Sequence, residues 1–307
     1  MNPLINRILA QFSGDDPIDR LARLSQSDFN SFMLEVYRRR TDKLKPAEVL
    51  KQFADNRFAA PSGIDPVAYL RLETDILTMA KEANIQPVLL SPVAPLGNSS
   101  VYGTVDQNNV VSATRGTEVL ADSTNMLATI VADRIKRGEV DNQDGVHLCS
   151  TDRLSRAQNY SGARSFAHFG LYGMVSSGKD RGSYQCEKEL LAKQFAFYRG
   201  FFGTRFRAET SIMLYKRSGY PDSDGFFGRM FDFVSSRLPD IPISKIDADS
   251  ENLYYKGLNF KIFATVDNET IEVGDGGFVD WTQRMLGNRK ERCLISGIGL
   301  DRLLSIR

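Results

Sequence analysis

Apolar positions three and four residues apart mark the chain up to about residue 60. Pro17–Leu24 and Phe29–Tyr37 both follow this spacing, which is typical of amphipathic helices. Pro46 opens a third stretch of the same kind, and proline is well tolerated in the first turn of a helix. The cluster Pro61–Pro66 then interrupts the pattern. We therefore predict a small N-terminal helical element over residues 1–62.

From residue 63 onward, helical spacing alternates with short apolar runs rich in β-branched and aromatic residues. Strand pairs with helices between them predict an α+β domain over residues 63–307, with a mainly antiparallel sheet flanked by helices. The predicted helices are Val67–Ala83, Leu120–Arg137 and Glu187–Phe202, and the predicted strands lie within Gln86–Pro92 and over Val110–Thr114, Gly145–Thr151, Ser165–Val175, Phe206–Tyr215, Asn259–Val266, Thr270–Val273 and Leu294–Ile298.

The composition is that of an ordinary globular protein. Of the 307 residues, 42% are hydrophobic and 25% are charged, which is enough for a large core. Lysine and arginine number 39 against 38 acids, and the resulting charge of +1 argues against a dedicated nucleic-acid binder.

Cysteine and histidine are scarce. Cys149, Cys186 and Cys293 are far apart and odd in number, which favours a reduced cytoplasmic compartment over a disulfide framework. His147 and His168 are the only histidines, and without a CxxC pair they predict no metal site. No apolar run approaches the roughly 20 residues that a membrane span needs, and the N-terminus lacks the apolar core of a signal peptide. We expect a cytoplasmic protein without membrane contact.

The C-terminal stretch Cys293-Leu-Ile-Ser-Gly-Ile-Gly-Leu-Asp-Arg302 carries the most specific pattern in the chain. An apolar strand meets two glycines, and a short helix then opens with an acid and an arginine, which is a geometry suited to close approach of a ligand. The stretch resembles motif 3 of the class II aminoacyl-tRNA synthetases, in which glycines precede an acidic residue and an arginine. The resemblance implies that Gly299 and Arg302 contact ATP.

A second arginine-rich segment lies upstream, in His147-Leu-Cys-Ser-Thr-Asp-Arg-Leu-Ser-Arg-Ala-Gln158 and the following Arg164-Ser-Phe166. It is similar to motif 2 of the histidyl-tRNA synthetases, which is two antiparallel strands joined by a loop. The resemblance implies that Arg153 holds the α-phosphate of ATP. Negative charge develops there as a carboxylate attacks, and a fixed guanidinium stabilises it through directed hydrogen bonds. Phe166 and Arg302 would enclose the adenine.

The segment from Tyr69 to Pro92 looks like motif 1, a long helix leading to a strand with a proline. In class II synthetases this motif forms the dimer interface, so the resemblance implies a homodimer through residues 67–92. Three further segments resemble loops of the histidyl branch: Ser112-Ala-Thr-Arg-Gly-Thr-Glu118, Tyr255-Lys-Gly-Leu-Asn-Phe-Lys261 and the glycine-rich turn at 274–277. The resemblance runs in order from about residue 67 to residue 307.

Together these matches imply a set of site residues. The implied catalytic residues are Arg153, Lys256 and Arg302. The implied nucleotide contacts are Arg153, Arg156, Arg164, Phe166, Gly299 and Arg302. The implied substrate contacts are Arg115, Thr117, Glu118, Gln158, Asn259, Gly276 and Gly277. ATP and Mg²⁺ are the implied cofactors, and an amino acid or another small carboxylate is the implied ligand.

Several positions depart from the histidyl pattern. Arg115 stands near the place of the loop glutamate that binds the substrate's ammonium group, although Glu118 lies close by. Ser155 replaces the motif 2 glutamate, and Lys256 replaces an arginine. Asn259 and its neighbours differ from the residues that shape the imidazole pocket, which argues against a histidine site.

Too few residues follow Arg302 for the anticodon-binding domain of the family, and Arg38–Arg40 is more typical of a solvated helix end than of an RNA contact. We therefore expect no charging of tRNA.

Three hypotheses about the function remain. The first is an enzyme that binds ATP and activates an amino acid or related carboxylate as an adenylate. The second is an inactive regulatory protein like the synthetase-like subunit of ATP phosphoribosyltransferase. The third is a dimeric scaffold.

Overall fold

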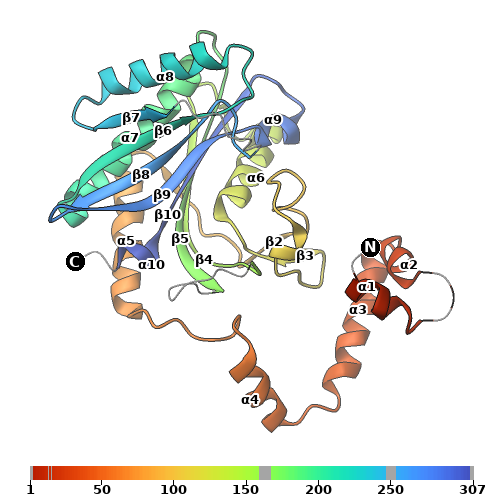
Figure 1. Ribbon diagram of the computed structural model, residues 1–307. Helices are drawn as coiled ribbons and strands as arrows, with labels where there is room; N and C mark the ends of the chain where they lie inside the picture. Colours follow the sequence, from red (N-terminus) through yellow and green to blue (C-terminus); the bar gives the residue numbers. More distant parts are fainter. Residues whose placement is uncertain (1–2, 13, 15, 159–166, 247–253, 305–307) are drawn as a thin grey trace.

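The computed structural model describes residues 3–12, 14, 16–158, 167–246 and 254–304. A single sheet of eight strands forms the centre of the molecule (Figure 1), in the order β1-β4-β5-β10-β9-β8-β6-β7. The outermost pairs on each side are parallel and the pairs between them are antiparallel, which confirms the predicted α+β class. The strands are β1 (Gln86–Pro87), β4 (Val146–Ser155), β5 (His168–Lys179), β6 (Glu209–Lys216), β7 (Ile243–Ile246), β8 (Leu258–Val266), β9 (Glu269–Val279) and β10 (Glu291–Gly299).

Helices cover both faces of the sheet, and each layer encloses its own apolar core. Helices α5 (Pro66–Glu82), α7 (Gln185–Phe206) and α8 (Ser223–Arg237) lie on one face, where the aromatic side chains of α7 fill the larger core. Helices α6 (Ser123–Lys136) and α9 (Trp281–Leu286) lie on the other face (Figure 1). Alternate residues of a strand therefore point into different cores. The remaining described elements are a two-stranded sheet of β2 (Val93–Pro95) and β3 (Thr117–Val119), the 3₁₀ turn η1 (Gln107–Asn109) and the short helix α10 (Leu300–Leu303).

Two sequence predictions about local structure are wrong. Val110–Thr114 is not a strand, because the chain turns at Arg115 and Gly116, which both have a φ of 66°, and only Ser112 forms an isolated bridge. The predicted glycine-rich turn at 274–277 is part of strand β9, and all four of its residues pair with both β8 and β10. Its glycines are needed for packing, since a Cβ on Gly276 would lie 2.4 Å from the carbonyl oxygen of Ile295.

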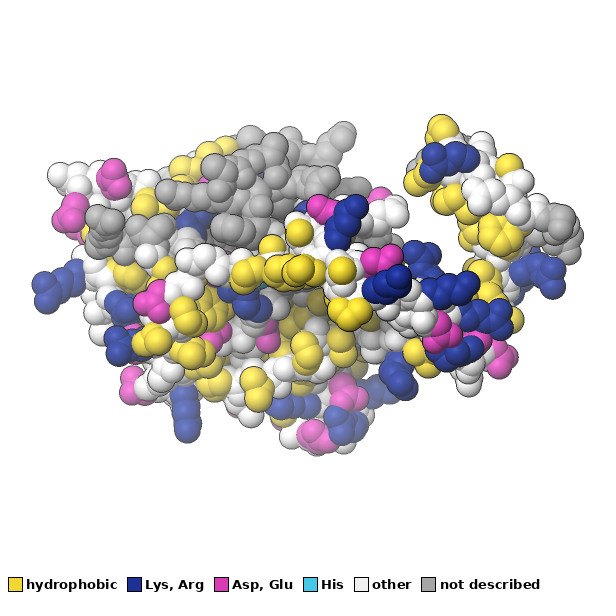
Figure 2. Space-filling model, turned by 90° about the horizontal axis from the view of Figure 1, so that it is seen from below, with side chains coloured by type: hydrophobic (Ala, Val, Ile, Leu, Met, Phe, Trp, Pro, Cys, Tyr) yellow, Lys and Arg dark blue, Asp and Glu magenta, His cyan; other side chains and the backbone are white. Residues whose placement is uncertain are grey.

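The N-terminal residues form four helices that carry no buried residue: α1 (Pro3–Leu9), α2 (Pro17–Ala22), α3 (Gln26–Thr41) and α4 (Pro46–Asp55). They extend as an arm beside the sheet domain (Figure 1), and apolar side chains are visible on the arm in Figure 2. The arginine run ends α3 as predicted, and Arg38 and Arg39 pair there with Glu35. None of the described helices is long and apolar enough to cross a membrane.

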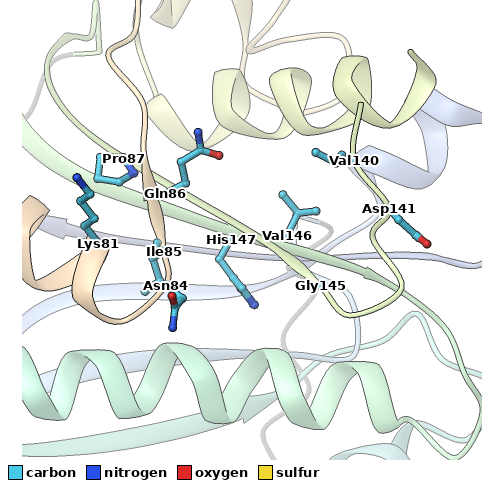
Figure 3. A pocket seen from close by; sticks show the side chains of 10 residues that line it. All are labelled: Lys81, Asn84, Ile85, Gln86, Pro87, Val140, Asp141, Gly145, Val146 and His147. Carbon is cyan, nitrogen blue, oxygen red and sulfur yellow. The ribbon is translucent and has the colours of Figure 1, made fainter. Parts of the chain in front are cut away.

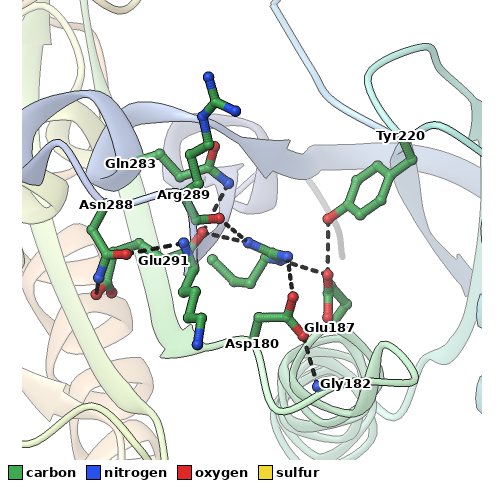
Figure 4. A network of polar contacts seen from close by, with 10 residues as sticks. Asp180, Gly182, Glu187, Tyr220, Gln283, Asn288, Arg289 and Glu291 are labelled. Carbon is green, nitrogen blue, oxygen red and sulfur yellow. Dashed lines mark hydrogen bonds and ion pairs between the residues drawn. The ribbon is translucent and has the colours of Figure 1, made fainter.

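An ion-pair network joins strand β10 to the start of α7 (Figure 4). Arg292 donates through Nε to Glu187 at 2.6 Å and through Nη2 to Asp180 at 2.7 Å. The hydroxyl of Tyr220 donates to the same oxygen of Glu187 at 3.0 Å. The Glu187 side chain is fully buried and that of Arg292 is 12% exposed. Each charge therefore offsets the desolvation cost of the other. All three cysteines are buried with free thiols.

A chain of hydrogen bonds crosses the sheet from β4, where it is partly buried, to β10. His147 Nδ1 lies 2.8 Å from the Ser176 hydroxyl, which also accepts from Gln194 at 3.0 Å. Gln194 in turn accepts from Ser296 at 2.7 Å. A neutral His147 with its proton on Nε2 would accept the hydrogen of Ser176 at Nδ1. Burial, with a smaller contribution from Lys193, lowers the pKa of His147 from 6.5 to about 4.

The lowered pKa of His147 predicts that the folded protein loses stability in acid. An unfolded His147 protonates near pH 6.5 and the folded one near pH 4, so the unfolded state binds more protons between these values. Stability should therefore be full above pH 6.5 and fall by up to about 3 kcal/mol as the pH drops to 4. Urea midpoints of the wild type and of His147→Gln, measured from pH 4 to pH 7.5, check this. The variant should show a shallower slope, and parallel curves would contradict the assignment.

Candidate functional site

Three segments that are distant in the sequence converge at Arg153. Its Nε and Nη2 donate to Nδ1 of His168 at 3.1 and 2.8 Å, and its Nη1 lies 3.6 Å from Asp301. Its guanidinium also lies over the ring of Tyr69 on α5, 5.6 Å from the centroid. Asp301 accepts from the Gly170 amide at 3.0 Å. The segments that resemble motifs 1, 2 and 3 thus meet at one point.

Arg153 lies on the α5 face of the sheet. It is paired in register with Gly170, where an added Cβ would come within 2.3 Å of the Tyr69 hydroxyl. His168 is in turn held by the carbonyl of Ala60, to which its Nε2 donates at 2.6 Å. The guanidinium of Arg153 is therefore engaged by neighbours within the fold. Its role as a phosphate ligand stays a prediction.

Arg156 follows β4 and lies on the opposite face. Its Nε donates to the carbonyl of Ala121 at 2.9 Å, its Nη2 lies 3.6 Å from Asp122, and its guanidinium lies over Phe169 at 5.1 Å. The alternation of side chains along a strand explains why residues 153 and 156, three positions apart, face different layers. Asp122 also caps helix α6, because its Oδ1 accepts from the Thr124 amide at 2.8 Å.

Arg156 lines a cavity of about 140 Å³ between the sheet and the start of α6. The cavity has a charged part and an apolar part. The other lining residues are Asp122, Thr124, Phe169, Leu171, Tyr254, Tyr255, Asp275, Ile295, Ser296 and Gly297. Sequence reasoning missed Asp122, Phe169, Tyr254, Tyr255 and Asp275, although two of them stand inside segments that it singled out.

Asp275 is the second carboxylate of the cavity. Solvent reaches its side chain, yet enough protein surrounds it that desolvation, with a contribution from Asp122, raises the pKa of the carboxyl above its ordinary value. The hydroxyl of Tyr255 donates to it at 3.5 Å. Gly277 makes room for that tyrosine, because a Cβ there would lie 2.5 Å from the Tyr255 ring.

The loop residues predicted to bind substrate lie elsewhere. Glu118 is fully buried, and its two oxygens accept from the amides of Gly97 and Ser99, both at 2.9 Å. This carboxylate organises the loop that follows β2. Thr117 donates to the carbonyl of Thr114 at 2.8 Å, and Arg115 is exposed in the turn. None of the three lines the cavity, and their roles stay predictions.

Asn259 is buried on β8, where it accepts from Arg217 at 2.7 Å. Lys256 lies 3.9 Å from Asp280 at the start of α9, next to the cavity tyrosines in sequence but outside the cavity lining. Gln158 is exposed, and its carbonyl accepts from Arg57 at 3.4 Å. The structure thus does not bring these predicted residues together with Arg156.

Arg302 donates through Nη1 to the carbonyl of Glu272 on β9 at 2.7 Å. Gly299 ends β10 and precedes α10, and a Cβ there would make only ordinary contact, at 3.8 Å from Arg302. Gly276 lies in β9 one residue after Asp275. Arg164 and Phe166 lie outside the described residues. No group of three or more metal-ligating side chains occurs among the residues that the structure describes.

A larger groove of about 840 Å³ lies at the outer edge of the sheet, between the end of α5 and the start of β4 (Figure 3). Lys81, Asp141 and His147 supply its ionisable side chains. None of the predicted site residues lines it. We therefore take the smaller cavity, which combines a guanidinium, two carboxylates and aromatic rings, as the candidate site.

Solved structures share this architecture. A histidyl-tRNA synthetase from S. aureus superposes with a TM-score of 0.60 over 80% of this chain and 71% of its own, at 10% sequence identity. A protein from Bacillus halodurans described as an ATP phosphoribosyltransferase regulatory subunit/histidyl-tRNA synthetase gives 0.59 over 81% and 83%, at 12% identity. The chain has the fold of the class II aminoacyl-tRNA synthetases. This confirms the resemblance drawn from the motifs.

A putative threonyl-tRNA synthetase from Aeropyrum pernix gives a TM-score of 0.61, with 78% of this chain covering 59% of that one at 12% identity. No protein-family model matches the sequence, and no curated protein matches it. At identities this low the likeness concerns the class II fold alone.

Proposed function

We propose that this class II synthetase-like protein binds ATP together with a small amino acid or related carboxylate and activates the acid as an adenylate, without charging tRNA. The observation that carries the proposal is the cavity in which Arg156 lies over Phe169 and faces Asp122. A guanidinium over an aromatic ring offers directed hydrogen bonds to a carboxylate or phosphate and a surface for stacking.

We assign the contact with the reacting acid to Arg156 rather than to Arg153. Arg156 lines the cavity, whereas Arg153 lies on the other face against Tyr69, His168 and Asp301. A guanidinium fixed beside the acid would stabilise the charge that develops as the carboxylate attacks the α-phosphate.

The dimensions of the cavity fit the acid and not the nucleotide. Its volume of about 140 Å³ compares with the roughly 10–15 Å³ that a cavity needs to hold one water molecule, so it accommodates about ten heavy atoms. ATP would bind outside it, beside Arg156. Mg²⁺, which the fold family implies, would be held chiefly by phosphate oxygens, because this ion usually binds through one or two carboxylates and the substrate.

The test is ATP–pyrophosphate exchange with a panel of amino acids and their deamino analogues. Exchange with one acid would support the proposal. If ATP binds without any exchange, adenylate formation is ruled out for that panel. A protein that binds neither ATP nor any acid in the panel would contradict the whole assignment.

A regulatory role is the second candidate. The buried Glu118 favours it, because the carboxylate that the family resemblance offers for an ammonium group is taken up by backbone amides. The Bacillus halodurans structure is described in part as a regulatory subunit. Binding of an amino acid without exchange, combined with association with a phosphoribosyltransferase catalytic subunit, would support this candidate.

We also propose a homodimer through residues 67–92. Val67 and Leu70 on α5 and Leu89 after β1 are 53%, 59% and 96% exposed, and apolar side chains left open in this way mark contact surfaces. Light scattering at micromolar concentration should give twice the chain mass. Leu89→Glu should shift the protein toward the monomer, whereas the exposed control Lys136→Glu should not. A monomeric wild type would contradict the proposal.

A further inference from the structure

The N-terminal arm reaches the candidate site at the end of β4. In Figure 1 the chain passes from α4 beneath the sheet domain to the start of α5. On the way, Arg57 donates through Nη2 to the carbonyl of Ala157 and through Nη1 to that of Gln158, the latter at 3.4 Å. These two residues directly follow Arg156, which lines the cavity. An arginine of the arm is therefore bound to the segment that carries the arginine of the candidate site.

Two further contacts hold the arm around this end of the sheet. The carbonyl of Ala60 accepts from Nε2 of His168, the first residue of β5, at 2.6 Å. The side chain of Gln26 on α3 lies against the turn before β3, where it would be 3.2 Å from a Cβ on Gly116. Because no residue of α1–α4 is buried, surface contacts of this kind rather than a shared core set the position of the arm.

The charge of Arg57 is not neutralised within the described part of the chain. A guanidinium carries five N–H donors, and the two carbonyls engage only two of its nitrogens. Both acceptors are uncharged, and none of the ion pairs among the described residues includes Arg57. Its Cζ lies 4.4 Å from the centre of the Phe58 ring, a pairing like that of Arg156 over Phe169. The remaining donors are open to a ligand that brings negative charge.

We infer that Arg57 is a nucleotide-binding residue supplied by the arm, and that its open donors take an outer phosphate of ATP. The inference rests on the proposed function and adds a residue to it. If the acid fills the cavity beside Arg156, the α-phosphate that it attacks lies at the mouth and the outer phosphates lie beyond, toward the solvent. Arg57 is exposed and bound to the two residues after Arg156, which places its guanidinium in that outer region.

Arg57 is also held in place before a ligand arrives. An exposed arginine loses side-chain freedom when it binds, and that loss weakens the complex. The two carbonyls and the Phe58 ring already restrict the Arg57 side chain, so a phosphate would meet a fixed group. Only a planar, forked cation can keep two carbonyls and still offer paired donors to a phosphate. A lysine at this position would keep the charge but lose this geometry.

Calorimetric titration of the full chain with ATP and with AMP tests the inference. Arg57→Ala should weaken ATP binding by about 10-fold, as for the loss of one hydrogen bond between charged groups, and leave AMP binding within about two-fold of the wild type. Arg57→Lys should lie between the wild type and Arg57→Ala for ATP. Arg40→Ala, which removes an exposed arginine at the end of α3, is the matched control and should bind both nucleotides as the wild type does.

An equal loss of ATP and AMP binding in Arg57→Ala would mean that Arg57 only holds residues 157–158 in place, and would overturn the inference. Unchanged ATP binding in that variant would overturn it too, while pyrophosphate exchange by the wild type would leave the proposed function standing. ATP binding that depends on Arg57, without exchange for any acid, would instead refute the proposed function alone. A wild type that binds no ATP would contradict both.

Discussion

Replacing Arg292 with methionine should lower the free energy of unfolding by about 3–5 kcal/mol. Among the residues that the structure describes, the change leaves the fully buried Glu187 with the Tyr220 hydroxyl as its remaining side-chain partner. Desolvation of a charge is costly, and removal of its partner exposes that cost. Urea denaturation at neutral pH measures the loss as a shift of the midpoint with an unchanged slope.

Two controls make the prediction specific. The double variant Arg292→Met/Glu187→Met should regain most of the stability, because two apolar side chains often replace a buried ion pair at little cost. Arg205→Met breaks an exposed ion pair with Asp75, of 2.8 Å, and should cost less than about 1 kcal/mol. If the double variant is no more stable than the single one, lost packing rather than an uncompensated charge is the cause.

Replacing Arg156 with alanine should weaken binding of the acid, measured by calorimetry, by about 100-fold, while Arg153→Ala should leave that affinity within a few-fold of the wild type. Truncating one member of a hydrogen-bonded charge pair costs about 2–5 kcal/mol, and each 1.4 kcal/mol is a factor of ten. Arg156 lines the cavity and Arg153 does not. Melting temperatures of both variants separate loss of binding from loss of fold, since each arginine also faces an aspartate.

The ATP affinity of the two variants shows which of the two arginines contacts the α-phosphate. The motif match assigns the α-phosphate to Arg153, and the position of the cavity assigns it to Arg156. If Arg153→Ala loses ATP and Arg156→Ala keeps it, the motif match prevails and Arg153 must turn away from His168 and Asp301 when the nucleotide binds. The opposite result places the nucleotide on the α6 face.

The sheet could be predicted because its strands have strong apolar patterns and the order of the motifs is preserved. The long helix α7 and the strands β5, β8 and β10 follow from those patterns. The sequence did not predict helix α8, because Gly225 and Gly228 lower the helix propensity of this segment. The spacing of Phe226, Met230 and Val234, all buried, was the signal available for it.

The site was less predictable than the fold. A motif match gives positions along the chain, whereas the face on which a side chain lies depends on strand register, as Arg153 and Arg156 illustrate. The motif match interpreted the glycines of β9 as a turn. Asp275, which lies between Gly274 and Gly276, was therefore not predicted as a site residue. The pairing of that stretch with β8 and β10, and the close packing at Gly276 and Gly277, show why it is a strand.

The three buried cysteines have a practical consequence. Burial raises the pKa of Cys149 and Cys186 to about 12 and that of Cys293 further, so the folded chain presents almost no thiolate. A thiol reagent can reach them only when the sheet domain opens. Their rate of labelling therefore reports how often the sheet domain opens, and a cysteine placed on the surface as a fluorescent probe would be modified selectively against a silent background.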